Sequence, residues 1–205
     1  MNKQNIFYTI IFSFITTFVF VFLLAFTYDL TKVKINQNQE LYLKKAVLTS
    51  LQVTYQDKDD IATQFAAKIK KIDSEEYSIY SLQKSGQINY AIIFSGNGLW
   101  GTITGALAVN ENLSRIIGVD IISHNETPGL GGRIDEPYFK EQFTNEKIIN
   151  NKISIKITGD GDENHENGEI DAISGATRTS DFFEIMINNY LLKMKNFLES
   201  SNDKQ

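Results

Sequence analysis

The sequence contains no cysteine, and only two histidines and two prolines occur among its 205 residues. Without cysteine the chain cannot form disulfides, use a thiolate nucleophile, or build a zinc or iron–sulfur site on thiolates. The two histidines, His124 and His165, are too few for a histidine-rich metal site. The formal net charge of -5 argues against nucleic-acid binding, which needs a basic face. With 42% hydrophobic residues the chain can still build an ordinary folded core.

Charged side chains are also missing from residues 4–28, and the run 6–25 is rich in Ile, Phe, Val and Leu. A helix needs about 20 apolar residues to cross the hydrocarbon core of a bilayer. A cleaved signal peptide has a shorter apolar stretch, of roughly 7–15 residues, and a small-residue exit. Here the bulky residues Phe26 and Tyr28 follow Ala25, so the small-residue pattern of a cleavage site is missing. We therefore predict a retained transmembrane anchor over residues 1–28, with a cleaved signal or a buried core helix as the alternatives. Lysines on both sides of the run leave its orientation undecided.

The remaining sequence predicts an α+β domain built on a mainly antiparallel sheet packed with helices. Helices are expected at residues 35–51, 59–72 and 138–143, and a last helix after Thr179 to about Leu198. Short β-branched runs separated by Gly, Asn and Ser predict strands at 77–82, 88–94, 103–109, 116–122 and 153–158. We expect residues 29–72 to form a helical stalk with leading helices, and residues 73–205 to form the folded domain.

One candidate site is the stretch Asp171–Ser180, just before the last helix. Its hydroxyl side chains belong to Ser174, Thr177, Thr179 and Ser180. Gly175 and Ala176 permit close approach to the backbone, and Arg178 could add a cation. Free amides and the dipole at a helix start stabilise a phosphate. The alternative is ordinary, because Ser/Thr-rich stretches often only cap a helix.

A second candidate is the loop 123–132, which contains three glycines and one of the two prolines. Such a backbone can approach a flat ligand closely. Glu126 and Thr127 could hydrogen-bond the edge of a heteroaromatic ring while Leu130 packs on its face. The alternative is a glycine-rich turn between a strand and a helix. A third segment, Gly96–Gly101, holds the only tryptophan, Trp100, and suits either a packed corner or a ligand platform.

Together these residues resemble a known family. Ser174-Gly-Ala-Thr177, preceded by Asp171, resembles the flavinylation motif of the FMN-binding domain of two membrane redox complexes. The proteins that carry this domain are NqrC of the Na+-translocating NADH:quinone reductase and RnfG of the Rnf-type ferredoxin:NAD oxidoreductase. Glu126-Thr-Pro-Gly-Leu-Gly131 matches the other signature of the family. The segment Gly98-Leu-Trp100-Gly101 is more similar to the NqrC form.

The resemblance implies a covalent flavoprotein that transfers electrons through FMN. A flavin transferase with FAD as donor would join the FMN phosphate to Thr177. The residues implied around the phosphate are Asp171, Ser174, Gly175, Ala176 and Arg178. Those implied around the flavin are Trp100, Glu126, Thr127, Gly129, Leu130 and Gly131. The same resemblance makes residues 73–205 the FMN-binding domain, on the extracytoplasmic side of the cell inner membrane, with other membrane subunits as partners.

The acidic loop 160–169 is not part of the family pattern. Asp160, Asp162 and Asn164 alternate as the first oxygen ligands of a calcium loop do, although His165 replaces the expected glycine. A solvated acidic turn is the favoured interpretation, and no metal is predicted. A reversible FMN-binding sensor module and a calcium-dependent surface protein remain as competing functions for the chain.

Overall fold

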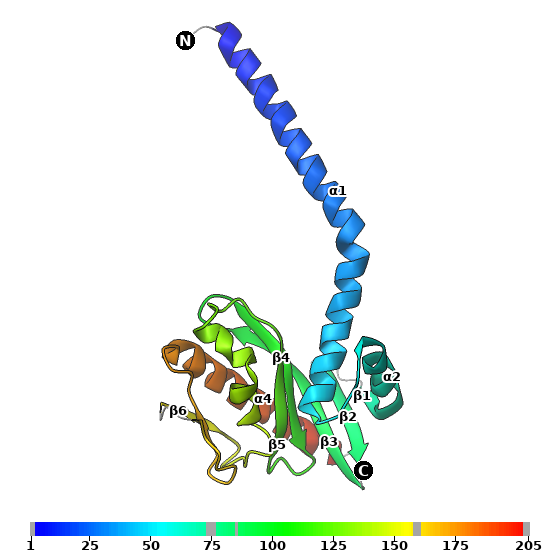
Figure 1. The fold of residues 1–205 in the computed structure, drawn as a ribbon, viewed down its shortest axis with the longest axis vertical. Helices are drawn as coiled ribbons and strands as arrows, with labels where there is room; N and C mark the ends of the chain where they lie inside the picture. The colour runs from blue at the N-terminus through cyan, green and yellow to red at the C-terminus, as the bar shows by residue number, and fades with distance from the viewer. Residues whose placement is uncertain (1–2, 73–76, 85, 158–160, 203–205) are drawn as a thin grey trace. The chain divides into compact units, whose positions relative to one another are not determined.

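The computed structural model describes residues 3–72, 77–84, 86–157 and 161–202, which fall into two units, Met1–Glu40 and Leu41–Gln205. Helix α1 (Lys3–Ser50) makes up the described part of the first unit and ends in the second (Figure 1). In the part of the chain that the structure describes, it is the one helix long and apolar enough to span a membrane. Its exposed side chains include a row of stacked rings at four-residue spacing, Phe14, Phe18, Phe22 and Phe26. The predicted anchor and the first part of the predicted stalk, as far as Ser50, are thus one continuous helix.

The second unit is built on a five-stranded antiparallel sheet in which each strand pairs with the next along the chain. The strands are β1 (Ile69–Ile72), β2 (Ile79–Lys84), β3 (Gln87–Asn97), β4 (Thr102–Asn110) and β5 (Ile116–Ser123). The mainly antiparallel α+β fold predicted from the sequence is therefore confirmed. Four of these strands lie close to their predicted positions, because their β-branched residues alternate between the two faces.

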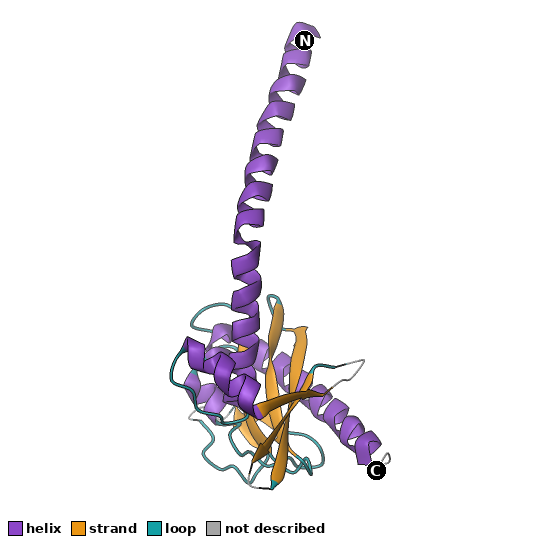
Figure 2. Cartoon of the chain, turned by 90° about the vertical axis from the view of Figure 1, so that its right-hand side faces the viewer, coloured by secondary structure: helices purple, strands orange, loops and turns teal. Residues whose placement is uncertain are grey.

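Helices cover both faces of this sheet (Figure 2). On one face, Phe94 and Leu107 pack against Phe183 and Ile187 of α4 (Thr177–Asn202). The opposite face presents small side chains to the end of α1 and to α2 (Lys58–Lys68), namely Ala91, Ala106 and Ala108. Successive residues of a strand point to opposite faces, so β4 alone serves both cores. This arrangement holds the start of α4 beside one end of the sheet.

The structure corrects three boundaries. Residues 69–72 are the strand β1 and not the end of a helix, because Ile69 and Ile72 pair with Leu82 and Ile79 of β2. The compact unit begins at Leu41 and not at residue 73, because the end of α1 is buried against the sheet. The last helix begins at Thr177, three residues before its predicted start at Ser180.

Shorter elements connect β5 to α4. They are the 3-10 helix η1 (Gly131–Asp135), α3 (Pro137–Glu141), β6 (Ser154–Lys156) and β7 (Glu169–Asp171). Strands β6 and β7 form a parallel pair, and the predicted strand 153–158 is confirmed only at Ser154–Lys156. Side chains of α4 hold the backbone before and within β6, since Asn188 accepts from the Ile153 amide at 2.9 Å and Glu184 accepts from the Ile155 amide at 2.9 Å.

A charge cluster around the buried Asp120 fastens η1 and α3 to the sheet. The Lys140 ammonium donates to Asp120 of β5 at 2.7 Å and to Asp135 at 2.8 Å, and Asp120 is only 3% exposed. Burial alone would lower the pKa of Lys140, but the hydrogen bonds to these carboxylates raise it above its ordinary value. Because the pKa of Lys140 is higher in the folded than in the unfolded chain, the cluster stabilises the fold fully at pH values below the unfolded pKa. This contribution is lost as the pH rises through the folded pKa.

We expect Lys140→Met to lower the free energy of unfolding by about 3 kcal/mol, because it leaves the Asp120 carboxylate buried without its cation. Chemical denaturation of the purified chain measures the change. Lys147→Met is the matched control, since its partner Glu166 is exposed and such a pair is worth at most about 1 kcal/mol. Equal losses in the two variants would contradict a structural role for the charge cluster.

Candidate functional site

Three segments far apart in the sequence meet at the start of α4. They are the turn between β3 and β4, the loop after β5, and the turn before α4. Glu126 connects them: its Oε1 accepts from the Trp100 amide at 3.0 Å, and its Oε2 accepts from the Thr179 hydroxyl at 2.7 Å. The loop 126–131 and the start of α4 thus lie together, although about 50 residues separate them.

Two of these segments are turns with glycine at the same position. In Thr127–Leu130 the Leu130 amide donates to the Thr127 carbonyl at 3.1 Å, with Pro128 second and Gly129 third at φ +74°. In Ile173–Ala176 the Ala176 amide donates to the Ile173 carbonyl at 2.9 Å, with Gly175 third at φ +78°. A positive φ at the third residue is the mark of a type II turn and favours glycine there.

The second turn delivers Thr177 to the first position of α4. The Ser180 hydroxyl holds this turn, since it accepts from the Ile173 amide at 3.1 Å and donates to the Ala176 carbonyl at 3.2 Å. Ala176 precedes the helix and has no side-chain oxygen with which to cap its amides. The amides of the first helical turn have no partner within the helix. The exposed hydroxyl-bearing side chain of Thr177 therefore stands beside amides suited to an anion.

Apolar side chains around this helix start are exposed. Trp100 is 70% exposed, Leu99 44% and Leu130 46%. Leu130 reaches across to the turn before α4, where its Cδ2 would lie 3.3 Å from a β-carbon placed on Gly175. Large exposed apolar residues beside a phosphate-binding backbone suit a flat, largely apolar ring attached to a phosphate.

Two glycines make room for the buried Glu126 carboxylate. A β-carbon at Gly98 would lie 2.5 Å from its Oε1, and one at Gly131 would lie 2.7 Å from its Oε2 and 2.5 Å from Oγ1 of Thr179. Gly129, by contrast, has no neighbour within 4 Å of such an atom. Thr179 and Gly98 are thus site residues that the resemblance did not place around the phosphate or the flavin. The sequence features that pointed to them are the hydroxyl of Thr179 within the helix-start motif and the position of Gly98 two residues before Trp100.

These distances predict different effects at the two glycines. Gly131→Ala should lower the free energy of unfolding by about 1–3 kcal/mol, because the new methyl group collides with the Glu126–Thr179 hydrogen bond. Gly129→Ala should lower it by about 1 kcal/mol, from the positive φ alone. Denaturant titrations of both variants give the comparison. A Gly129→Ala variant that is the less stable of the two would contradict the assignment.

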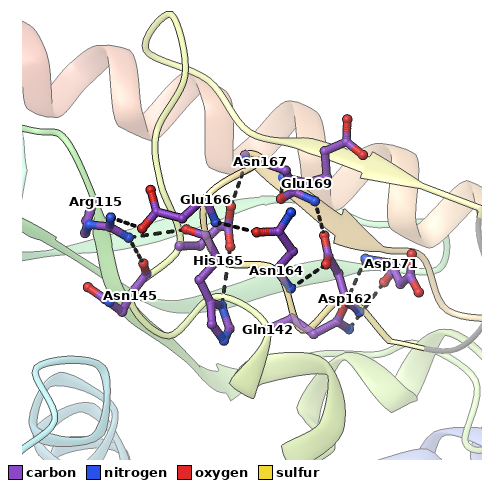
Figure 3. A network of polar contacts seen from close by, with 12 residues as sticks. Arg115, Gln142, Asn145, Asp162, Asn164, His165, Glu166, Asn167, Glu169 and Asp171 are labelled. Carbon is purple, nitrogen blue, oxygen red and sulfur yellow. Dashed lines mark hydrogen bonds and ion pairs between the residues drawn. The ribbon is translucent and has the colours of Figure 1, made fainter.

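Two further residues of the predicted site, Asp171 and Arg178, flank the turn before α4 in the sequence. Asp171 is buried in β7, and its amide donates to Oε1 of Gln142 at 2.8 Å (Figure 3). The Arg178 guanidinium is exposed and lies over the Phe182 ring, 5.5 Å from its centroid. Asp171 can therefore support the segment leading to Thr177, and Arg178 is free to turn toward an anion at the helix start.

The acidic loop forms a series of side-chain turns. The carboxylate of Asp162 accepts from the Asn164 amide at 2.7 Å and from Nδ2 of Asn167 at 2.7 Å (Figure 3). Asn164 in turn accepts from the Glu166 amide at 3.2 Å. Asp160 lies outside the described residues. Within the described ranges no group of three His, Cys, Asp or Glu side chains is placed to hold a metal ion. The two described members of the calcium pattern are thus engaged with the loop itself.

Comparisons with known proteins agree with this geometry. The family model of the FMN-binding domain matches residues 98–192, which include all three converging segments. The NqrC protein of the Na(+)-translocating NADH-quinone reductase of Pasteurella multocida is 32% identical over 125 residues, covering 60% of this chain and 46% of the relative. The corresponding Vibrio campbellii protein is 36% identical over 105 residues, covering 49% and 40%. The chain spans less than half the length of these curated relatives.

Two solved structures share the fold. The NqrC structure from Parabacteroides distasonis superposes with a TM-score of 0.67 at 24% identity, covering 80% of this chain and 95% of that one. Shewanella oneidensis NqrC gives a TM-score of 0.70 at 18% identity, covering 80% and 99%. Residues 98–192 thus match the family model of the FMN-binding domain, and the chain has the fold of the NqrC structures.

Proposed function

We propose that this chain is a membrane-anchored flavoprotein subunit of a Na+-translocating NADH:quinone reductase, with FMN joined through its phosphate to Thr177. The observation that carries the proposal is the convergence of an exposed threonine, a helix start preceded by alanine and exposed apolar side chains. The relatives of known name support an NqrC role over an RnfG role in the Rnf complex. A covalent link is favoured over reversible binding because Thr177 lies within the Ser-Gly-Ala-Thr motif.

The residues present fit a phosphate-linked flavin. The Thr177 hydroxyl and the first amides of α4 would hold the phosphate, and Arg178 could add its charge. Leu130 and Trp100 would cover the ring from two of the three converging segments. Thr127 is exposed on the same loop and offers a hydroxyl to the ring edge. When bound, FMN would supply the electron-transfer chemistry, which side chains cannot provide.

Attachment would require a flavin transferase and FAD. The Thr177 oxygen would attack the FMN-side phosphorus of FAD and form the new phosphoester bond. The P–O–P bond of the donor would break, AMP would leave, and the hydroxyl proton would pass to a base of the transferase or to water. A phosphoester at an exposed threonine needs no rearrangement of the buried core, because only the first turn of α4 is involved.

Intact mass tests the proposal. The chain co-expressed with a flavin transferase should gain the mass of one FMN less one water, and this gain should survive denaturation. Expression without the transferase is the control and should give the unmodified mass. Flavin that is released entirely on denaturation would support the reversible sensor module instead.

The location of the domain is a separate prediction. With α1 as a single-pass anchor in the cell inner membrane, we expect the domain after it to lie on the extracytoplasmic side, where the other membrane subunits would receive its electrons. Protease added to spheroplasts should then digest the domain. A cytoplasmic marker protein should stay intact in the same sample. Digestion that begins only after the inner membrane is lysed would reverse the orientation.

A further inference from the structure

We infer that Glu126 and Thr179 are positioning residues, whose hydrogen bond fixes the Trp100 turn onto the start of α4 and thereby presents Thr177 for flavin attachment. The part of the inference that concerns flavin attachment rests on the proposed function. It assigns Glu126 a place behind the ligand surface, different from the direct contact with the ring edge expected from the sequence.

Burial and bonding place Glu126 in this supporting role. Glu126 is only 4% exposed, and each of its carboxylate oxygens already accepts a hydrogen bond from the protein. A buried carboxylate is costly unless its oxygens are satisfied, and bonds to a charged acceptor are among the stronger ones. The Trp100 amide and the Thr179 hydroxyl are therefore the donors that satisfy the buried Glu126 carboxylate.

The surrounding backbone is shaped to this link. Gly98 adjoins one carboxylate oxygen of Glu126 and Gly131 adjoins the other, and a β-carbon on either glycine would come within 2.7 Å of that oxygen. The Glu126 amide also donates to Nδ1 of His124 at 3.2 Å, which restrains the backbone of the residue itself. Side chains larger than hydrogen at either glycine would displace the carboxylate from its two donors.

The link also fixes the start of α4, where the preceding residue, Ala176, has no side-chain oxygen to serve as a cap. Thr179 is the third residue of α4, and its hydroxyl donates to the carboxylate from within the first turn. A negative charge at this end of a helix is stabilising, because the dipole is positive there. The amides of the first turn can then remain available to an anion while a side chain fixes the helix start. Thr177, two residues earlier, would be held in one orientation by the same contact.

Two readouts test the link in the full-length chain in detergent. Because Trp100 is the single tryptophan, time-resolved anisotropy of tryptophan fluorescence reports the motion of its turn without any flavin. Thr179→Val keeps the shape of the side chain but removes the donor. We expect faster local depolarisation of Trp100, and an initial rate of flavin attachment to Thr177 reduced roughly tenfold, the equivalent of one lost hydrogen bond to a charged group. Thr179→Ser should restore both.

Thr63→Val is the matched control, because its hydroxyl is exposed on α2 and bonds only within that helix at 3.2 Å. Circular dichroism verifies that each variant is folded. Should Thr179→Val not fold, Glu126→Gln carries the same test, since one end of the amide cannot accept a hydrogen bond. Unchanged Trp100 anisotropy and an unchanged attachment rate in the folded variant would overturn the inference. Failure of the wild-type chain to accept flavin would instead overturn the proposed function, and the anisotropy would still decide the link.

Discussion

Thr177→Ala will abolish covalent attachment of FMN, while leaving the fold intact. The substitution removes the one oxygen through which the proposed phosphoester forms. Thr177 is exposed at the first position of α4, and alanine is the most favourable residue for a helix, so the loss of stability should be within about 0.5 kcal/mol. Flavin fluorescence in a denaturing gel, together with intact mass, measures the outcome after co-expression with the transferase.

Two further variants sharpen this result. Thr177→Ser keeps an oxygen at the same place and should retain attachment at a reduced rate. Ser174→Ala should only weaken attachment, because Ser174 is exposed at the second residue of the turn and does not hold that turn closed. Covalent flavin in Thr177→Ala would show that another hydroxyl carries the link, and peptide mapping would then identify it.

The elements that could be predicted from the sequence are those specified by local patterns. The β-branched runs of β3 and β4 and the Pro-Gly pair at Pro128 and Gly129 indicated strands and a turn without knowledge of distant partners. The strand β1 could not be predicted in this way. Its four residues continue directly from α2, and their pairing with β2 depends on contacts that the local sequence does not encode.

The candidate site shows the same division. The family resemblance placed residues of both glycine-containing segments around one FMN, and in the structure a hydrogen bond between Glu126 and Thr179 joins the loop to α4. Periodicity placed the start of the last helix after Thr179, because Thr177 and its neighbours are polar and resemble a cap. The turn closed by Ala176 and Ile173, with Ser180 behind it, allows the helix to begin earlier. The hydrogen bonds of the Ser180 hydroxyl to the preceding turn depend on the folded backbone, and a local sequence pattern does not reveal them.

Leu130→Asp should lower the midpoint potential of the attached flavin by about 20–50 mV without preventing attachment at Thr177. Leu130 is 46% exposed and extends toward Gly175, so a ring held from Thr177 would meet it directly. A carboxylate in that place disfavours the added negative charge of the reduced flavin by roughly 1 kcal/mol in partly exposed surroundings, which converts to a shift of this size. Attachment is spared because the Thr177 hydroxyl and the amides of α4 are unchanged.

Leu192→Asp is the matched control for this charge. Leu192 is a leucine of similar exposure, at 54%, on the same helix as Thr177. Its position 15 residues later corresponds to about 22 Å along α4, beyond the range of a screened surface charge. Redox titration of both variants followed by flavin absorbance should therefore shift the potential only in Leu130→Asp. Equal potentials in the two variants would mean that the ring does not rest on Leu130. It would then have to lie against Trp100 or a partner subunit, with the phosphate still held at Thr177.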